Sequence, residues 1–149
     1  MPFSITFKDE PLLYPYDNAT TPAAVGLLVL GDHEEEFLSS LYQWNRGEYE
    51  AQWQRAIKLL LNGESKAALI TEYLSPEYAT HLQWRPMYRI GDTVFFQHHL
   101  LLYDTLREPF SVQVAFSFLQ DRMTKNEEGK NISEWSVSLA DIEAFGRTF

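Results

Sequence analysis

Residues 81–103 read HLQWRPMYRIGDTVFFQHHLLLY, and this stretch decides the fold class. Two runs rich in apolar and aromatic residues flank Gly91-Asp92, a two-residue connection of the kind that joins the strands of a tight β-hairpin. Pro86 has no N–H group to donate to a strand ladder, so we expect its strand to lie at a sheet edge or beside a bulge. The stretch therefore predicts an antiparallel sheet built around this hairpin.

An amphipathic helix is predicted upstream, over residues 47–61. Asn45 and Glu48 have the spacing of a capping box, in which each side chain accepts a hydrogen bond from a backbone N–H group that the helix leaves free. Asn62-Gly63 closes the helix with residues that tolerate a left-handed backbone. Apolar residues recur every three or four positions and predict one buried stripe: Tyr49, Trp53, Ala56, Ile57 and Leu60.

The remaining sequence supplies further strands. The apolar runs at residues 23–30 and 66–74 have the length of strands, and the first can extend past the acidic residues that follow it to Phe37 and Leu38. Residues 132–138 form another predicted strand. These segments give the hairpin several partners for an antiparallel sheet.

Two segments near the end of the chain involve helices. Ser138 and Asp141 cap a last predicted helix. Residues 111–122 alternate like a strand and fit a helix capped by Ser111 equally well, so both structures stay open for this segment. The inner face of the last helix is predicted to contain Ile142, Phe145 and Phe149.

Strands that follow one another with few crossover helices favour the α+β class. We predict a single domain over residues 1–149, made of a mainly antiparallel sheet with helices packed on it. Residues 1–22 are expected to form an irregular lead-in, since residues 11–22 carry three of the seven prolines. A chain of 149 residues with 45% hydrophobic residues is large enough to bury one core.

The composition also limits the chemistry and the location of the protein. The sequence contains no cysteine, which excludes a disulfide, a thiolate metal site and a cysteine nucleophile, and fits a reducing compartment. The first residues lack the pattern of a signal peptide, and the longest apolar run is far shorter than the roughly 20 residues that cross a bilayer. We therefore expect a cytoplasmic protein that is not bound to a membrane.

The net charge is −9 and it is unevenly distributed. Residues 1–50 contain nine acidic residues against Lys8 and Arg46, so this third of the chain carries a charge of −7. Such a field repels nucleic-acid phosphates and attracts basic proteins. The composition therefore predicts no nucleic-acid binding, although acidity that serves only solubility is an equally simple interpretation.

The acidic run at residues 32–36 is the strongest local signal for a binding surface. Three consecutive carboxylates beside an apolar strand are costly to bury and repel one another when exposed. They fit either a solvated turn or a surface that meets a basic protein. On the second interpretation, replacing them touches no predicted core residue and leaves stability nearly unchanged. The predicted partner-binding residues are Asp32, Glu34, Glu35, Glu36, Trp44 and Asp104.

Motifs for catalysis or metal binding are absent from the sequence. His98 and His99 are adjacent, so in a strand they point to opposite faces and cannot hold one ion together. His81 can approach His98 across the hairpin, but no carboxylate accompanies them at metal-ligand spacing. Glycine-rich phosphate loops and nucleophile elbows are also missing. We expect no cofactor, metal or catalytic residue, although a small hydrolase with an unmarked carboxylate pair stays an alternative.

Three stretches resemble the CdiI-type immunity proteins of contact-dependent growth inhibition systems. They are residues 32–37 with 42–44, the helix that carries Tyr49 and Trp53, and residues 132–135 before the last helix. Their order and spacing extend the resemblance over most of residues 24–149. The likeness is to the subgroup that is paired with CdiA C-terminal toxins acting as ribosomal RNA nucleases.

The resemblance implies a function for the whole chain. It implies a cytoplasmic protein without enzymatic activity that binds its cognate CdiA C-terminal toxin domain, a basic nuclease, and blocks the toxin's access to RNA. We also expect a monomer before the toxin is bound. An acidic adaptor domain that binds a basic protein other than a toxin is the alternative that charge alone supports.

Overall fold

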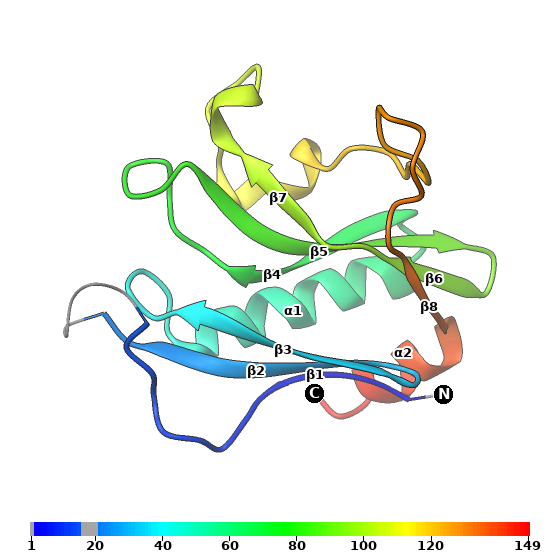
Figure 1. The fold of residues 1–149 in the computed structure, drawn as a ribbon. Helices are drawn as coiled ribbons and strands as arrows, with labels where there is room; N and C mark the ends of the chain where they lie inside the picture. Colours follow the sequence, from blue (N-terminus) through cyan, green and yellow to red (C-terminus); the bar gives the residue numbers. More distant parts are fainter. Residues whose placement is uncertain (1, 16–20) are drawn as a thin grey trace.

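The computed structural model describes residues 2–15 and 21–149, which form two antiparallel sheets, two α-helices and two short 3-10 helices around a shared core (Figure 1). This is the predicted α+β class, with two sheets in place of one. The elements in chain order are β1 Phe3–Phe7, β2 Ala23–Leu30, β3 His33–Ser40, α1 Arg46–Leu61, β4 Lys66–Glu72, β5 His81–Ile90, β6 Thr93–Phe96, β7 His99–Leu102, η1 Tyr103–Thr105, η2 Val112–Phe118, β8 Trp135–Ser138 and α2 Leu139–Gly146.

The first sheet has the order β1-β2-β3. β2 has the predicted bounds, and the acidic residues that follow it belong to strand β3. β1 corrects the expected irregular lead-in: Phe3 and Ile5 are buried and pair with Leu30 and Leu28, so the alternation of apolar residues at the start of the chain is a strand signal. The ring of Phe37 lies against Gly26, where any Cβ atom would clash with it.

The second sheet has the order β4-β5-β6-β8, with β7 also paired to β5. β5 and β6 form the predicted hairpin, and Gly91 takes the positive φ that its turn needs. Of the two positions predicted for Pro86, a sheet edge or beside a bulge, the edge is wrong, because β5 is flanked by β4 on one side and by β6 and β7 on the other. Pro86 instead lies opposite the break between β6 and β7. Its carbonyl accepts a hydrogen bond from the Gln97 N–H group, but proline has no N–H group that could donate to Gln97.

Helix α1 confirms the predicted cap and stripe. Asn45 Oδ1 accepts from the Glu48 N–H group and Glu48 Oε1 accepts from the Asn45 N–H group, at 2.8 and 3.2 Å. The five buried residues of the helix are those predicted from the spacing. Trp53 is in contact with both sheets, because its ring packs on Phe37 of β3 and its Nε1 donates to the carbonyl of Ile70 in β4 at 2.7 Å.

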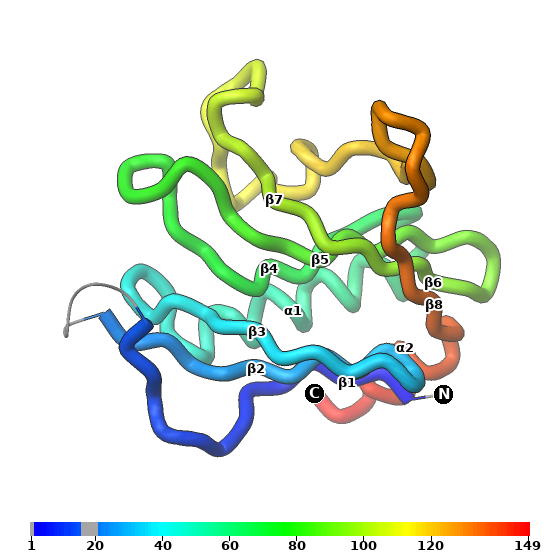
Figure 2. The backbone as a smooth tube through the Cα atoms, viewed as in Figure 1, coloured from blue at the N-terminus to red at the C-terminus, as the bar shows by residue number. Residues whose placement is uncertain are grey.

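The segment between β7 and β8 covers the side of the second sheet that faces away from the first sheet, as Figure 2 shows. Of the two structures left open for residues 111–122, the helical one is closer: residues 112–118 form the 3-10 helix η2, although the Ser111 side chain does not cap it. Ser138 caps α2 as predicted, and Ile142 is fully buried, whereas Phe149 is 43% exposed. In the described residues, no helix is long and apolar enough to cross a membrane.

Candidate protein-binding surface

The acidic run forms strand β3, whose side chains alternate between the two faces of the first sheet. Glu34 and Glu36 are exposed on the outer face, opposite Val29 and Leu27 of β2, and Asp32 is exposed in the turn before the strand. Exposure lets these carboxylates keep their hydration, so the strand carries them at little cost. The result is an acidic outer face on the first sheet.

Lys8 pairs with part of this acidic face. Its Nζ lies 2.6 Å from Glu36 Oε1 and 2.9 Å from Glu10 Oε1. Hydrogen bonds to Glu10 and Glu36 raise the pKa of Lys8 above its ordinary value. Pairs of this kind are weak on an exposed surface, so Lys8 lowers the local charge without fixing the shape of the face.

Glu35 points to the opposite face of β3 and bonds to Arg85 of β5. Glu35 Oε1 accepts from Arg85 Nε at 2.9 Å, and Arg85 is only 4% exposed. This corrects the expectation that the whole acidic run lies apart from the core, because Glu35 neutralises a buried cation that joins the two sheets. Burial lowers the pKa of Arg85, and the charge of Glu35 opposes that change.

His33 precedes the carboxylates and joins the first sheet to β8. Its ring stacks on Trp135 with the ring centroids 4.4 Å apart, and its Nε2 lies 3.3 Å from Glu35 Oε2. Trp135 belongs to one of the stretches that carry the family resemblance. The stack on Trp135 and the ion pair between Glu35 and Arg85 therefore hold the inner side of β3 against the second sheet.

Trp44 and Asp104, the other predicted contact residues, lie outside the acidic strand. Trp44 is half-buried before α1 and packs on Tyr73 and Tyr49, with ring centroids 4.4 and 5.1 Å away. Asp104 is exposed in η1, directly after β7 of the second sheet. The structure therefore brings Asp32, Glu34 and Glu36 together on β3 and its turn, and places Trp44 and Asp104 on other elements.

A buried polar network that the sequence did not predict stabilises the loop before β8. Gln97 is 1% exposed, and its Nε2 donates to Glu134 Oε2 at 2.8 Å and to the carbonyl of Met123 at 2.9 Å. Arg122 binds both oxygens of Glu134, at 2.6 and 2.9 Å, and lowers the pKa of that carboxyl. No local sequence spacing marks this network, because its members come from three separate segments.

The same network sets the tautomer of His99. Since both N–H bonds of Gln97 Nε2 are used, its Oε1 is an acceptor and the His99 Nε2, 2.7 Å away, is the donor. Burial lowers the pKa of His99, which favours this neutral imidazole. The neighbouring His98 points to the other face, as expected, and lies 3.3 Å from Gln83 Oε1. The expected approach of His81 to His98 is wrong, because His81 pairs with Leu102.

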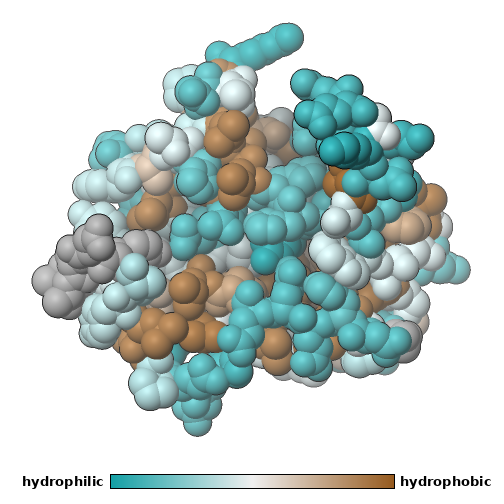
Figure 3. All heavy atoms as spheres, in the orientation of Figure 1, coloured by the Kyte–Doolittle hydropathy of each residue, from teal (hydrophilic) through white to brown (hydrophobic). Residues whose placement is uncertain are grey.

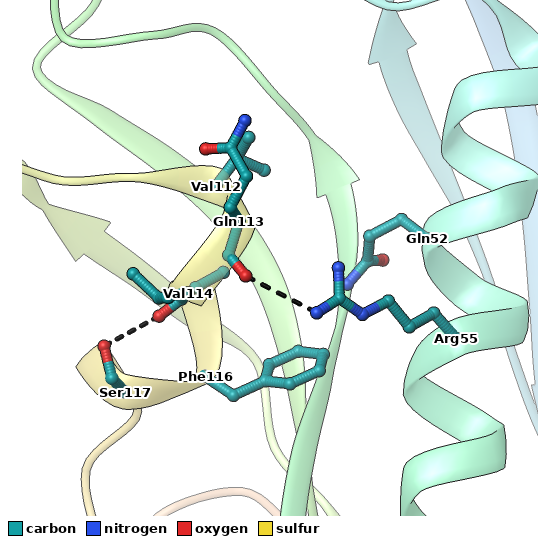
Figure 4. Close-up of a pocket in the computed structure, with 8 residues that line it drawn as sticks. Gln52, Arg55, Val112, Gln113, Val114, Phe116 and Ser117 are labelled. Atoms are coloured by element: carbon teal, nitrogen blue, oxygen red, sulfur yellow. Dashed lines mark hydrogen bonds between the residues drawn. The ribbon is translucent and has the colours of Figure 1, made fainter.

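Several hollows mark the described surface. One of about 270 Å³ lies between α1 and η2 and is shown in Figure 4. Arg55 Nη2 donates there to the carbonyl of Gln113 at 3.4 Å, and Ser117 Oγ donates to the carbonyl of Val114 at 2.7 Å. The described residues that line it include no carboxylate or imidazole, and across the described chain no group of three or more potential ligands is placed to hold a metal ion.

The structure is thus that of an acidic α+β domain with a charged strand on its surface, which suits binding to another protein. The family model described as the CdiI N-terminal domain matches residues 39–145, and the chain belongs to that family. This confirms the resemblance to CdiI immunity proteins that the sequence suggested. The subgroup paired with ribosomal RNA nucleases stays a prediction.

Two similar proteins extend the comparison. "Immunity protein CdiI" of Enterobacter cloacae subsp. cloacae is 24% identical over 143 residues, which cover 96% of this chain and 95% of the relative. The fold is also that of a chain in the solved "CdiA-CT/CdiI toxin and immunity complex from Enterobacter cloacae". The two chains superpose with a TM-score of 0.85 at 23% identity, over 98% of this chain and 97% of the other.

Proposed function

We propose that this chain is an immunity protein that binds the C-terminal toxin domain of a cognate CdiA protein and neutralises it in the cytoplasm. Membership of the CdiI N-terminal domain family is the observation that carries the proposal. The likeness to the Enterobacter cloacae immunity protein over 96% of the chain supports it.

The finer part of the proposal is that the toxin is a basic nuclease and that binding blocks its access to RNA. A nuclease needs basic residues to hold the phosphate backbone, so an acidic partner complements it. The chain carries a net charge of −9, and Glu34 and Glu36 place part of that charge on the outer face of β3. The same charge opposes direct binding of RNA to this protein, which acts as a monomer before it meets the toxin.

Neutralisation requires no chemistry from this chain. Long-range attraction increases the rate of encounter, and a small set of well-packed contacts then provides most of the binding energy. Asp32, Glu34 and Glu36 are suited to the first task because they are exposed and lie on one strand and its turn. Glu35 is less suited to it, since Arg85 already holds it.

Co-expression with the cognate CdiA C-terminal domain tests the proposal. We expect the chain to restore the growth of cells that make the toxin, and the purified pair to form a one-to-one complex that leaves RNA intact. A mixture in which toxin and chain stay separate on a sizing column, with growth still arrested, would favour the adaptor alternative. A control incubation of the chain alone with RNA should show neither cleavage nor binding.

A further inference from the structure

The edge of β4 is capped by side chains, although no strand of the described residues pairs with it on that side. Gln52 of α1 donates from Nε2 to the carbonyl of Ala68 at 2.8 Å and accepts at Oε1 from the N–H group of Ile70 at 2.9 Å. Trp53 donates to the carbonyl of Ile70 at 2.7 Å. These bonds replace those that an added strand would make, so α1 closes this edge against another chain.

The outer edge of β7 has no such cover. The hydrogen bonds from Tyr103 N to Thr80 O and from Gln97 N to Pro86 O show which residues of β7 form hydrogen-bonded pairs with β5. Because bonded pairs alternate, the backbone N–H and C=O groups of Leu100 and Leu102 point away from β5. The Leu102 carbonyl is already used at the start of η1, where Thr105 Oγ1 donates to it at 2.7 Å, so the outward groups that stay open in the described residues are those of Leu100 and the Leu102 N–H group.

The sequence of β7 also lacks the usual protection of an edge strand. Its four residues, His99–Leu102, include no lysine, acid or proline. Leu100 and Leu102 are 52% and 43% exposed and share one face, since they lie two residues apart. Figure 3 shows hydrophobic side chains over β7, above a hydrophilic area that lies between β7 and β3.

We propose that β7 accepts an extended segment of the toxin domain as an added strand, with Leu100 and Leu102 packing against the segment's side chains. The inference rests on the proposed function and identifies the part of the interface that provides most of the binding energy. Backbone bonds along β7 supply affinity, and the exposed leucines favour apolar residues at alternate positions of the segment.

Charge and position favour the toxin over a second copy of this chain. Two copies would each bring a net charge of −9 to the contact, whereas a basic domain is attracted. The ion pair between Glu35 of β3 and Arg85 of β5 holds the acidic strand beside the sheet that contains β7. Strands β3 and β7 both lie on the near side of the molecule in Figure 1, so one basic partner can cover the acidic strand and the β7 edge.

Hydrogen exchange on the free protein and on its complex with the cognate CdiA C-terminal domain tests the proposal. The amides of Leu100 and Leu102 should exchange quickly in the free protein and about tenfold or more slowly in the complex. The amides of His99 and Leu101 face β5 and should be protected in both states. A complex that forms and neutralises the toxin while Leu100 and Leu102 exchange as before would overturn this inference and leave the proposed function standing.

A substitution gives an independent measurement. Leu100→Pro removes an outward N–H group without removing a bond to β5, and the extended residue before it suits proline. It should raise the dissociation constant about tenfold. The control Ile90→Ala removes an exposed apolar side chain at the other end of the sheet, keeps the backbone N–H group that pairs with Thr93, and should leave affinity unchanged. Protection of Leu100 that depends on protein concentration in the absence of toxin would identify a second copy as the occupant and overturn the proposal. If the wild-type chain binds no toxin, the proposed function and this inference fail together.

Discussion

Glu35 Oε1 lies 2.9 Å from Arg85 Nε, and this ion pair is a direct side-chain link between strands β3 and β5 of the two sheets. Arg85 is buried, and its Nη1 has no hydrogen-bond partner in the described residues, so the carboxylate of Glu35 is the compensation for its charge. One member of the acidic run therefore maintains the structure, while its two neighbours, Glu34 and Glu36, face solvent.

Replacing Glu35 should destabilise the fold. Glu35→Ala leaves Arg85 buried without a counter-charge, which costs about 2–3 kcal/mol, less than for a fully enclosed pair because the Glu35 side chain keeps some contact with solvent. Urea denaturation followed by tryptophan fluorescence measures the change. Glu34→Ala is the matched control on the same strand and should change stability by less than about 0.5 kcal/mol. Equal effects of the two substitutions would show that the ion pair does not stabilise the fold.

Reversing the outer carboxylates should slow toxin binding without unfolding the protein. Glu34→Lys with Glu36→Lys inverts the charge of the outer face, and we expect the association rate to fall by about one to three orders of magnitude. Added salt should lower the association rate of the wild-type protein and change that of the variant much less. Stopped-flow or surface kinetics over a range of salt concentrations measures both.

The control for this reversal is another pair of exposed carboxylates. Glu127→Lys with Glu128→Lys makes the same change in net charge on the loop between η2 and β8. If both variants slow association equally, total charge steers the encounter and β3 has no special part in it. Glu35 stays unchanged in this experiment because it pairs with Arg85.

Trp53 should be one of the most costly core residues to truncate. Its side chain is 2% exposed, contacts both sheets and satisfies the carbonyl of Ile70. Trp53→Ala should lower the free energy of unfolding by about 3–5 kcal/mol. Trp53→Phe keeps most of the ring and loses the hydrogen bond, so it should cost distinctly less. Denaturant unfolding compares the two, and a loss below about 1 kcal/mol for Trp53→Ala would contradict the packing described here.

Stability should decrease as the pH falls from neutral to about 5. Burial lowers the pKa of His99 in the folded state, so the unfolded chain takes up a proton first, near the ordinary histidine pKa of about 6.5. Stabilisation by the neutral imidazole is thus complete above that pKa and is lost as the pH drops toward the folded-state value.

Unfolding free energies at pH 7.5 and 5 measure this loss. His99→Gln retains a side-chain N–H for Gln97 and cannot titrate, so its stability should change less between the two pH values. His81→Gln serves as the control at a histidine whose Nδ1 bonds to the neighbouring Thr80. Carboxyls with lowered pKa values, such as that of Glu134, lose their charge only at lower pH. An unaltered pH dependence in His99→Gln would refute the assignment.

Local patterns determined much of the fold directly. The bounds of β2, the capping box of α1 and its buried stripe follow from residues at most a few positions apart, because helix and strand periodicity act over that range. The hairpin turn at Gly91 is of the same kind, since a two-residue connection needs a residue that takes a positive φ. The acidic strand was visible in composition, and the family resemblance rested on short stretches in a fixed order.

The tertiary structure decided which side of each strand was buried and which edges stayed open. Adjacent glutamates look alike in sequence, yet a strand turns Glu34 to solvent and Glu35 to a buried arginine fifty positions away. Pro86 signalled a missing donor, but only the positions of β6 and β7 showed that the gap lies inside the sheet. Likewise, Gln52 of α1 closes the edge of β4, whereas the edge of β7 has no such cover. Each outcome is set by contacts between distant segments, which residue spacing along the chain does not encode.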